Sequence, residues 1–225
     1  MIFRFLRGAG NEPLERVQEK VRAMLELDRR EFDLSMAALL GDAAAADVNA
    51  EVRSVDQKVN RLEREIRREL VVHSSVFGGI DSPSVLVYMS VVKDIERVGD
   101  YAKNLLDLAR DGATLRGVPD EAEWRRTAEE VSTFIISAGE VFNRDDIRRG
   151  RELRGRGDEM LRRFDECVSA LVRGEDQAPQ GVGRALAYRY LKRVVAHLMN
   201  LLSAVIMPVD QLDYFDEDPE DRLTE

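Results

Sequence analysis

The chain has 225 residues, of which 44% are hydrophobic and 34% are charged, and its formal net charge is −9. This composition is typical of a folded protein with a well-solvated surface. Most of the negative charge lies between Asp210 and Glu225, so the rest of the chain is almost neutral. The sequence therefore lacks the basic surface that nucleic-acid binding requires.

Further features indicate a cytoplasmic protein. The single cysteine, Cys167, excludes an intrachain disulfide, and we expect it to be a buried or half-buried apolar residue in a reducing compartment. No run reaches the roughly 18 apolar residues that a membrane span needs. The stretch Met1–Leu6 is too short for the apolar region of a signal peptide.

The spacing of apolar residues predicts six helices in chain order. They cover approximately residues 13–40, 47–73, 83–110, 121–142, 146–172 and 182–206. Ser82 and Pro83 are suited to the N-cap and first position of the third helix. The sixth helix is almost entirely apolar after Leu186, so we expect it to be deeply buried.

The two halves of the chain resemble each other. Residues 39–63 align with 141–165, and residues 96–104 align with 192–200 across a shorter loop. Each three-helix unit is too thin to bury its apolar face well alone, so the repeat predicts an all-α fold of two stacked units. The predicted parts are an N-terminal segment (1–12), a first unit (13–115), a second, degenerate unit (119–208) and an acidic, flexible tail (209–225).

A carboxylate pair stands out in the third predicted helix. Glu96 and Asp100 are four residues apart, so they share one face, one turn apart. Two like charges at this spacing repel each other by a few tenths of a kcal/mol, and a bound cation would remove that repulsion. Gly99 between them costs roughly 1 kcal/mol relative to alanine in a helix interior, which indicates close approach of another helix, chain or ion.

Other oxygen donors lie within reach if the second and third helices are antiparallel neighbours. These donors are Asp56, Asn60, Glu63 and Asn104. Together with Glu96 and Asp100 they would form an oxygen-only site. Such a site favours magnesium, manganese or iron, with calcium as a further option.

A simpler interpretation is that Lys93, Arg97 and Lys103 neutralise these acids on a solvated helix. Asp28 falls on the apolar stripe of the first helix, and we expect it at the edge of that stripe or paired with an arginine, a further metal ligand being the alternative. His73 and His197 are expected to be structural. A di-iron enzyme core would need a glutamate three residues before a histidine, and neither has one. Nothing in the sequence suggests catalysis.

Residues 91–104, Val-Val-Lys-Asp-Ile-Glu-Arg-Val-Gly-Asp-Tyr-Ala-Lys-Asn, resemble the signature helix of the PhoU family, and residues 56–66 resemble the helix before it. The resemblance covers about residues 15–207. It implies two tandem three-helix bundles related by pseudo-twofold symmetry, with metal ions, often iron, bound at Glu/Asp-x-x-x-Asp motifs. It also implies a non-enzymatic negative regulator of phosphate uptake that contacts a phosphate transporter subunit and a sensor histidine kinase and forms a homodimer.

Within this resemblance, Glu96 and Asp100 match the ligand pair, with Arg97 and Gly99 beside them, and Asp56 matches an acid of the partner helix. The second unit departs from the pattern, and we predict no second site of the same kind. Lys192 and Ala196 stand at the two ligand positions there.

One feature leaves an alternative open. The sequence Asp81-Ser82-Pro83 replaces the Asp-Leu-Arg segment of the family, which puts a partner contact through that arginine in doubt. The alternative is a metal-free structural accessory subunit of a sodium- or proton-coupled phosphate transporter. The apolar and basic segment Met1–Arg7 is expected to cover one end of the bundle, and at most to make a peripheral contact with a membrane or transporter.

Overall fold

The structure is a computed structural model that describes residues 12–77 and 81–212. These residues form six long helices, a short 3-10 helix η3 (Val209–Gln211) and no strand. The helices are α1 (Glu12–Leu39), α2 (Ala45–Phe77), α3 (Ser82–Arg110), α4 (Glu121–Arg144), α5 (Ile147–Val172) and α6 (Gly181–Ile206). The predicted all-α fold is confirmed. The segment 1–11 and the acidic residues from 213 onward lie outside the described residues.

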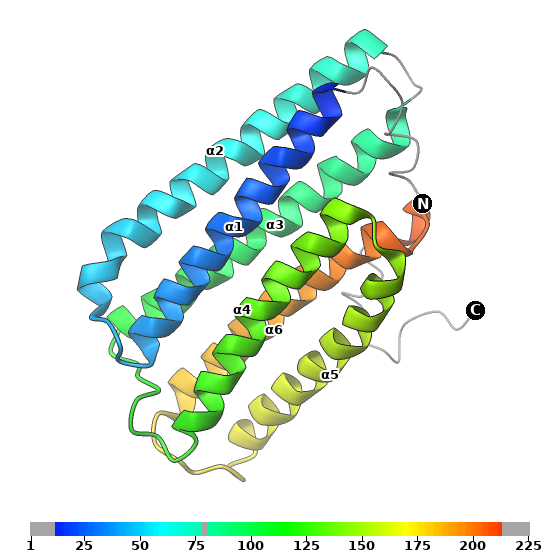
Figure 1. Cartoon of the computed structure of the whole chain (residues 1–225). Helices are drawn as coiled ribbons and strands as arrows, with labels where there is room; N and C mark the ends of the chain where they lie inside the picture. Colours follow the sequence, from blue (N-terminus) through cyan, green and yellow to red (C-terminus); the bar gives the residue numbers. More distant parts are fainter. Residues whose placement is uncertain (1–11, 78–80, 213–225) are drawn as a thin grey trace.

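The helices form two bundles that lie side by side (Figure 1). α1, α2 and α3 pack against one another in the first bundle, and α4, α5 and α6 do so in the second. α1 contacts α4 and α3 contacts α6 across the junction. Because each contact joins equivalent helices of the two halves, the arrangement has the expected pseudo-twofold relationship. The residue limits predicted for the two units stay a prediction.

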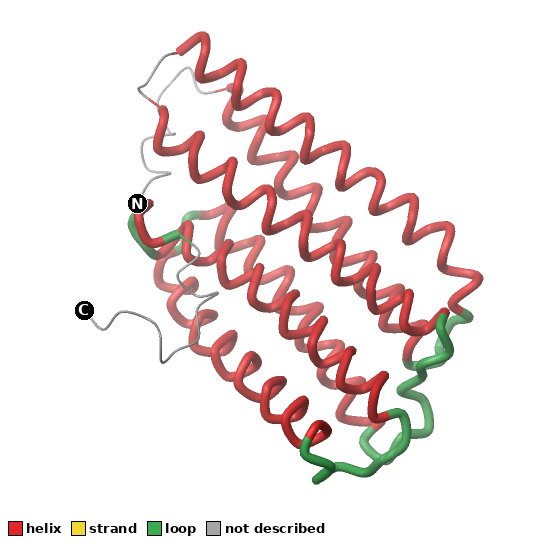
Figure 2. Tube along the Cα trace, turned by 180° about the vertical axis from the view of Figure 1, so that it is seen from behind, coloured by secondary structure: helices red, strands yellow, loops and turns green. Residues whose placement is uncertain are grey.

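One continuous hydrophobic core includes residues from all six helices. α6 lies at its centre, and every residue from Val194 to Val205 is buried, as the apolar sequence predicted. Each buried aliphatic side chain contributes roughly 1.5–3 kcal/mol relative to an exposed one. Figure 2 shows that the connections lie at the ends of the helices, so the long faces of the molecule are formed by helices.

The start of α3 differs from the prediction. α3 begins at Ser82, and Asp81 rather than Ser82 occupies the N-cap position, with Pro83 in the first turn. The Asp81 side chain makes no cap hydrogen bond, because its Oδ2 lies 3.0 Å from Nε2 of the buried His73 at the end of α2. This contact gives His73 the structural role that was expected.

Within the described residues, no helix combines the length and the apolar character that crossing a bilayer would require. The single cysteine, Cys167, is half-buried on α5, in agreement with its predicted environment.

Candidate metal centre

The predicted acids of α2 and α3 meet around one lysine. Lys103 Nζ donates to Asp56 Oδ1 of α2 at 2.7 Å and to Asp100 Oδ1 of α3 at 2.8 Å. The three side chains are only 17–28% exposed. Burial lowers the pKa of Lys103, but its hydrogen bonds to Asp100 and Asp56 outweigh that effect and hold the pKa above its ordinary value. The structure thus brings carboxylates from two helices to a single cation.

Glu96 lies one turn before Asp100 on the same face of α3. Arg97 Nη1 donates to Asp100 Oδ2 at 3.3 Å, and Arg97 Nε lies 3.7 Å from Glu96 Oε2. Burial, followed by the negative charge of Asp100, raises the pKa of Glu96. Lys103 and Arg97 therefore neutralise Asp100, as the simpler interpretation of the sequence had it. Among the described residues, Glu96 has only the longer ion pair with Arg97.

The remaining predicted ligands lie around this pair with their own contacts. Asn60 Nδ2 donates to Asp56 Oδ2 at 3.2 Å. Glu63 Oε1 forms an ion pair with Arg67 Nη2 at 2.8 Å, and its charge acts on Glu96. Asn104 is half-buried one turn beyond Asp100, and no hydrogen bond joins it to these carboxylates in the described part of the chain.

Two further acids lie beneath these residues on α1. Asp28 and Glu31 are completely buried. Within the described residues, none of their four carboxylate oxygens has a hydrogen-bond partner. The expectation that Asp28 lies at the edge of the stripe or pairs with an arginine is therefore wrong. Sequence reasoning missed Glu31, although an acid three residues after Asp28 and next to Phe32 was a usable signal.

The raised pKa values of Asp28 and Glu31 reflect burial away from water and the negative charge of nearby acids. Burial raises the pKa of Asp28 well above its ordinary value, and the charges of Glu31 and Glu96 raise it further. Burial also raises the pKa of Glu31, to about 8, with Asp56 adding to the shift and Lys103 opposing it. The buried acids and the outer carboxylates thus belong to one cluster formed by α1, α2 and α3.

Gly99 faces the two buried carboxyl groups. A Cβ atom at this position would lie 2.8 Å from Asp28 Oδ1 and 3.5 Å from Glu31 Oε2. The predicted close approach is confirmed, and the approaching group is a carboxyl group of α1. Any other residue at position 99 would push against that group, so glycine permits the close packing of α1 against α3 at this point.

The donor atoms of this cluster suit a hard cation, because such ions take carboxylate and amide oxygens as ligands. The side chains do not form a ready ligand sphere. No group of three or more histidine, cysteine, aspartate or glutamate side chains has that arrangement among the described residues. Lys103 lies between Asp56 and Asp100, so an ion bound by both would have to displace its ammonium group.

The corresponding place on the second bundle is different. Lys192, aligned with Glu96, forms an ion pair with Asp165 of α5, and their Nζ and Oδ2 atoms are 2.6 Å apart. Ala196, aligned with Asp100, is buried. The second bundle thus holds an ion pair where the first has clustered carboxylates.

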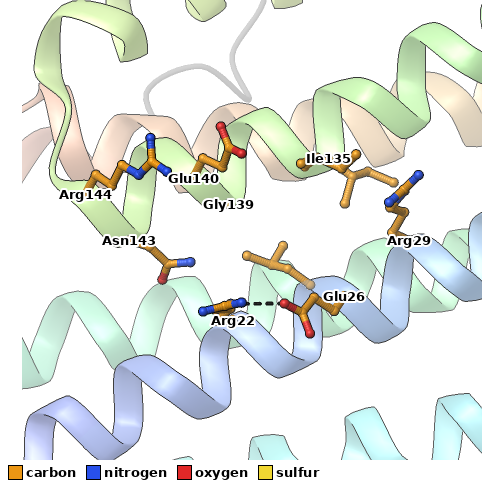
Figure 3. A pocket seen from close by; sticks show the side chains of 10 residues that line it. Arg22, Glu26, Arg29, Ile135, Gly139, Glu140, Asn143 and Arg144 are labelled. Carbon is orange, nitrogen blue, oxygen red and sulfur yellow. Dashed lines mark hydrogen bonds and ion pairs between the residues drawn. The ribbon is translucent and has the colours of Figure 1, made fainter.

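A separate groove runs between α1 and α4 (Figure 3). It has a volume of about 480 Å³, and none of the clustered carboxylates lines it. Arg22 of α1 lies opposite Glu140 of α4, and Arg29 of α1 lies opposite Ile135 of α4 at the other end of the groove. Arg22 donates to Glu26 at 3.0 Å, and Glu140 accepts from Arg149 at 2.6 Å, so charges on both sides of the groove are already paired.

These features define an all-α protein of two paired three-helix bundles, one of which carries an acidic cluster. The family model for the PhoU domain matches residues 21–109, which include α2 and most of α1 and α3. The chain therefore carries a PhoU domain, and the resemblance to the PhoU family inferred from the sequence is confirmed.

Similarity to individual PhoU proteins extends over most of the chain. A phosphate-specific transport system accessory protein PhoU homolog of Pseudomonas putida is 26% identical over 213 residues, which are 90% of this chain and 81% of the relative. The crystal structure of PhoU from Pseudomonas aeruginosa matches with a TM-score of 0.75 and 25% identity, covering 87% of this chain and 96% of that one. The phosphate transport system regulatory protein PhoU of Streptococcus pneumoniae shares the fold, with a TM-score of 0.69 at 12% identity over 95% of this chain.

Proposed function

We propose that this protein is a cytoplasmic regulatory accessory protein of phosphate transport that acts through contacts with other proteins. Support comes from the PhoU domain and from the Pseudomonas putida relative, which is named as an accessory protein of a phosphate-specific transport system. As the resemblance implies, we propose negative regulation of uptake through a phosphate transporter subunit and a sensor histidine kinase, with the protein acting as a homodimer.

The proposal includes a metal ion at the carboxylate cluster of the first bundle. The observation that carries it is the convergence of Asp56 and Asp100, from two different helices, on the ammonium group of Lys103. The proposed ligands are Glu96, Asp100, Asp56, Asn60, Glu63 and Asn104. Their oxygen atoms favour magnesium, manganese or iron. The bound ion would supply positive charge that holds α2 against α3, while Arg97 and Gly99 support the ligand pair.

Metal analysis of the purified full chain tests the site. We expect stoichiometric bound metal in the wild-type protein and its loss in a Glu96→Gln, Asp100→Asn double variant. The matched control is Glu15→Gln with Glu19→Gln, because these exposed acids have the same spacing on α1. Metal retained by the Glu96 and Asp100 variant would reject the ligand assignment.

Phosphate uptake by cells that lack the protein tests the regulatory role. Deletion of a negative regulator should raise uptake in phosphate-rich medium, and expression of the wild-type chain should restore the lower rate. Unchanged uptake after deletion would contradict the proposal.

The second candidate function is a metal-free accessory subunit of a sodium- or proton-coupled phosphate transporter. The observation in its favour is that Lys103 and Arg97 already neutralise Asp100. The two candidates differ in one outcome. A wild-type protein that contains no metal and still lowers uptake would favour the metal-free subunit.

A further inference from the structure

We propose that Asp28 and Glu31 of α1 are the inner ligands of the cation site, so that the ion lies between α1, α2 and α3 and not on the outer face of α3. This inference rests on the metal binding proposed above and names the residues that would complete the site.

The first argument is the state of the two side chains. Both are fully buried, and none of their four oxygens has a hydrogen-bond partner in the described part of the chain. Folded proteins pair nearly all of their buried polar atoms, and those left unpaired require an explanation. Buried carboxyl groups are tolerated when they are paired or when they coordinate a metal. No basic side chain pairs with these two among the described residues, so a bound cation would supply the partner that their oxygens lack.

The second argument is the charge around them. Four acids act on Asp28, and they come from each of the three helices: Glu31, Asp56, Glu96 and Asp100. Lys103 already forms ion pairs with both Asp56 and Asp100. The buried side of the cluster therefore holds more carboxyl groups than basic partners, and a divalent cation with oxygen ligands would balance their charge when they ionise.

The third argument is the position of Gly99. Because a Cβ atom there would lie 2.8 Å from Asp28 Oδ1, glycine lets the buried carboxyl group approach the helix that carries the outer pair Glu96 and Asp100. The absence of a side chain thus coincides with the place where the buried acids come next to α3.

The second bundle supports the same conclusion by contrast. Val195 is aligned with Gly99, and Lys192 and Ala196 are aligned with the outer pair. Of the residues that the structure describes, no acid of α4, α5 or α6 is buried. The buried acids, the glycine and the outer carboxylates therefore occur together in one bundle and are missing together from the other.

Titration of the metal-free full chain with Mn²⁺ tests the inference. Asp28→Asn and Glu31→Gln preserve the shape of each side chain and remove its negative charge. We expect each to weaken Mn²⁺ binding at least tenfold, as Glu96→Gln should. The matched control is Asp33→Asn, which makes the same change at an exposed position of α1 and should leave Mn²⁺ affinity unchanged.

A second measurement separates ligand loss from damage to the fold. The Tm of the metal-free Asp28→Asn and Glu31→Gln variants should equal or exceed that of the wild type, whereas the rise in Tm on adding Mn²⁺ should be lost. If both variants bind Mn²⁺ as the wild type does while Glu96→Gln does not, the inner ligands are rejected and the outer site stands. If the wild-type chain binds no Mn²⁺, the inference and the proposed metal site are both rejected.

Discussion

The two bundles have the same helix order but treat acidic residues differently. In the first bundle, Asp28 and Glu31 are buried without partners. In the second, Glu130 and Asp165 remain partly exposed and pair with Arg163 and Lys192. The repeated scaffold thus folds with or without buried acids, so the acids of the first bundle are not needed to form a three-helix unit.

A third buried acid, Asp94, differs from Asp28 and Glu31 because it has hydrogen-bond partners. Asp94 of α3 lies at the junction of the bundles, where its Oδ1 is 2.8 Å from Nδ1 of His197 and accepts from Asn200 Nδ2 at 3.0 Å. These partners from α6 satisfy the carboxylate and join the two bundles. Asp94 and His197 therefore stabilise the packing, whereas the unpaired Asp28 and Glu31 require another explanation.

The largest expected effect is that the buried Glu31 of the first bundle makes the stability of the protein depend on pH. In the metal-free protein the pKa of Glu31 is about 8, against 4.5 as its ordinary value. At pH values between these two pKa values, Glu31 holds a proton in the folded state and releases it in the unfolded chain. The free energy of unfolding therefore falls as the pH rises. The slope for one such group reaches about 1.4 kcal/mol per pH unit.

Urea titrations between about pH 5 and pH 8 in the presence of a chelator would measure this slope. Glu31→Gln should make the dependence shallower, and the raised pKa of Asp28 should leave a residual slope of the same sign. Equal slopes for the wild type and Glu31→Gln would contradict the burial of an ionisable Glu31.

The next effect concerns the lysine of each bundle. Lys103→Met removes the cation shared by Asp56 and Asp100, so we expect the metal-free protein to lose about 1–3 kcal/mol of stability. The same change should raise Mn²⁺ affinity severalfold, because a competing positive charge is gone. Thermal melts and Mn²⁺ titration would measure the two effects.

Lys192→Met is the control in the second bundle, since it breaks the ion pair with Asp165. Its cost should be at most about 1 kcal/mol because Asp165 is 46% exposed, and Mn²⁺ affinity should not change. A loss of Mn²⁺ binding in Lys103→Met would show that the lysine supports the site instead of competing with the ion.

A smaller effect is expected at two helical glycines. Gly155 on α5 has open space around its Cβ position, so Gly155→Ala should stabilise the protein by roughly 0.5–1 kcal/mol. Gly99→Ala should lose this gain and weaken Mn²⁺ binding, because the added methyl group presses on the Asp28 carboxyl group. Equal stabilisation by both changes, with unchanged Mn²⁺ binding, would show that the close contact between Gly99 and the Asp28 carboxyl group is not needed for binding.

The smallest expected effect on Mn²⁺ binding comes from transferring the outer motif to the second bundle. Lys192→Glu with Ala196→Asp restores the acid spacing on α6, but that bundle offers no buried acids within the described residues. We expect no additional equivalent of bound Mn²⁺ in metal analysis, and a loss of stability of about 1–3 kcal/mol because position 196 is buried. A second equivalent would mean that the outer carboxylate pair suffices for binding.

The sequence by itself determined the six helices and the outer part of the candidate site. Helix positions follow from local apolar spacing, and a four-residue separation places Glu96 and Asp100 on one face in any α-helix. The cost of Gly99 was also visible, because it depends only on helix propensity. The convergence of Asp56 and Asp100 needed one assumption, that α2 and α3 are neighbours, and the structure confirms it.

Only the tertiary structure decided that Asp28 and Glu31 are buried without partners and that Lys103 joins α2 to α3. Burial depends on which helices cover a given face, and that information is not contained in the spacing along one helix. An acid on an apolar stripe looks the same in sequence whether it reaches solvent, meets an arginine or lies under a neighbouring glycine. The packing of α3 against α1, with Gly99 over the two carboxyl groups, resolved that ambiguity.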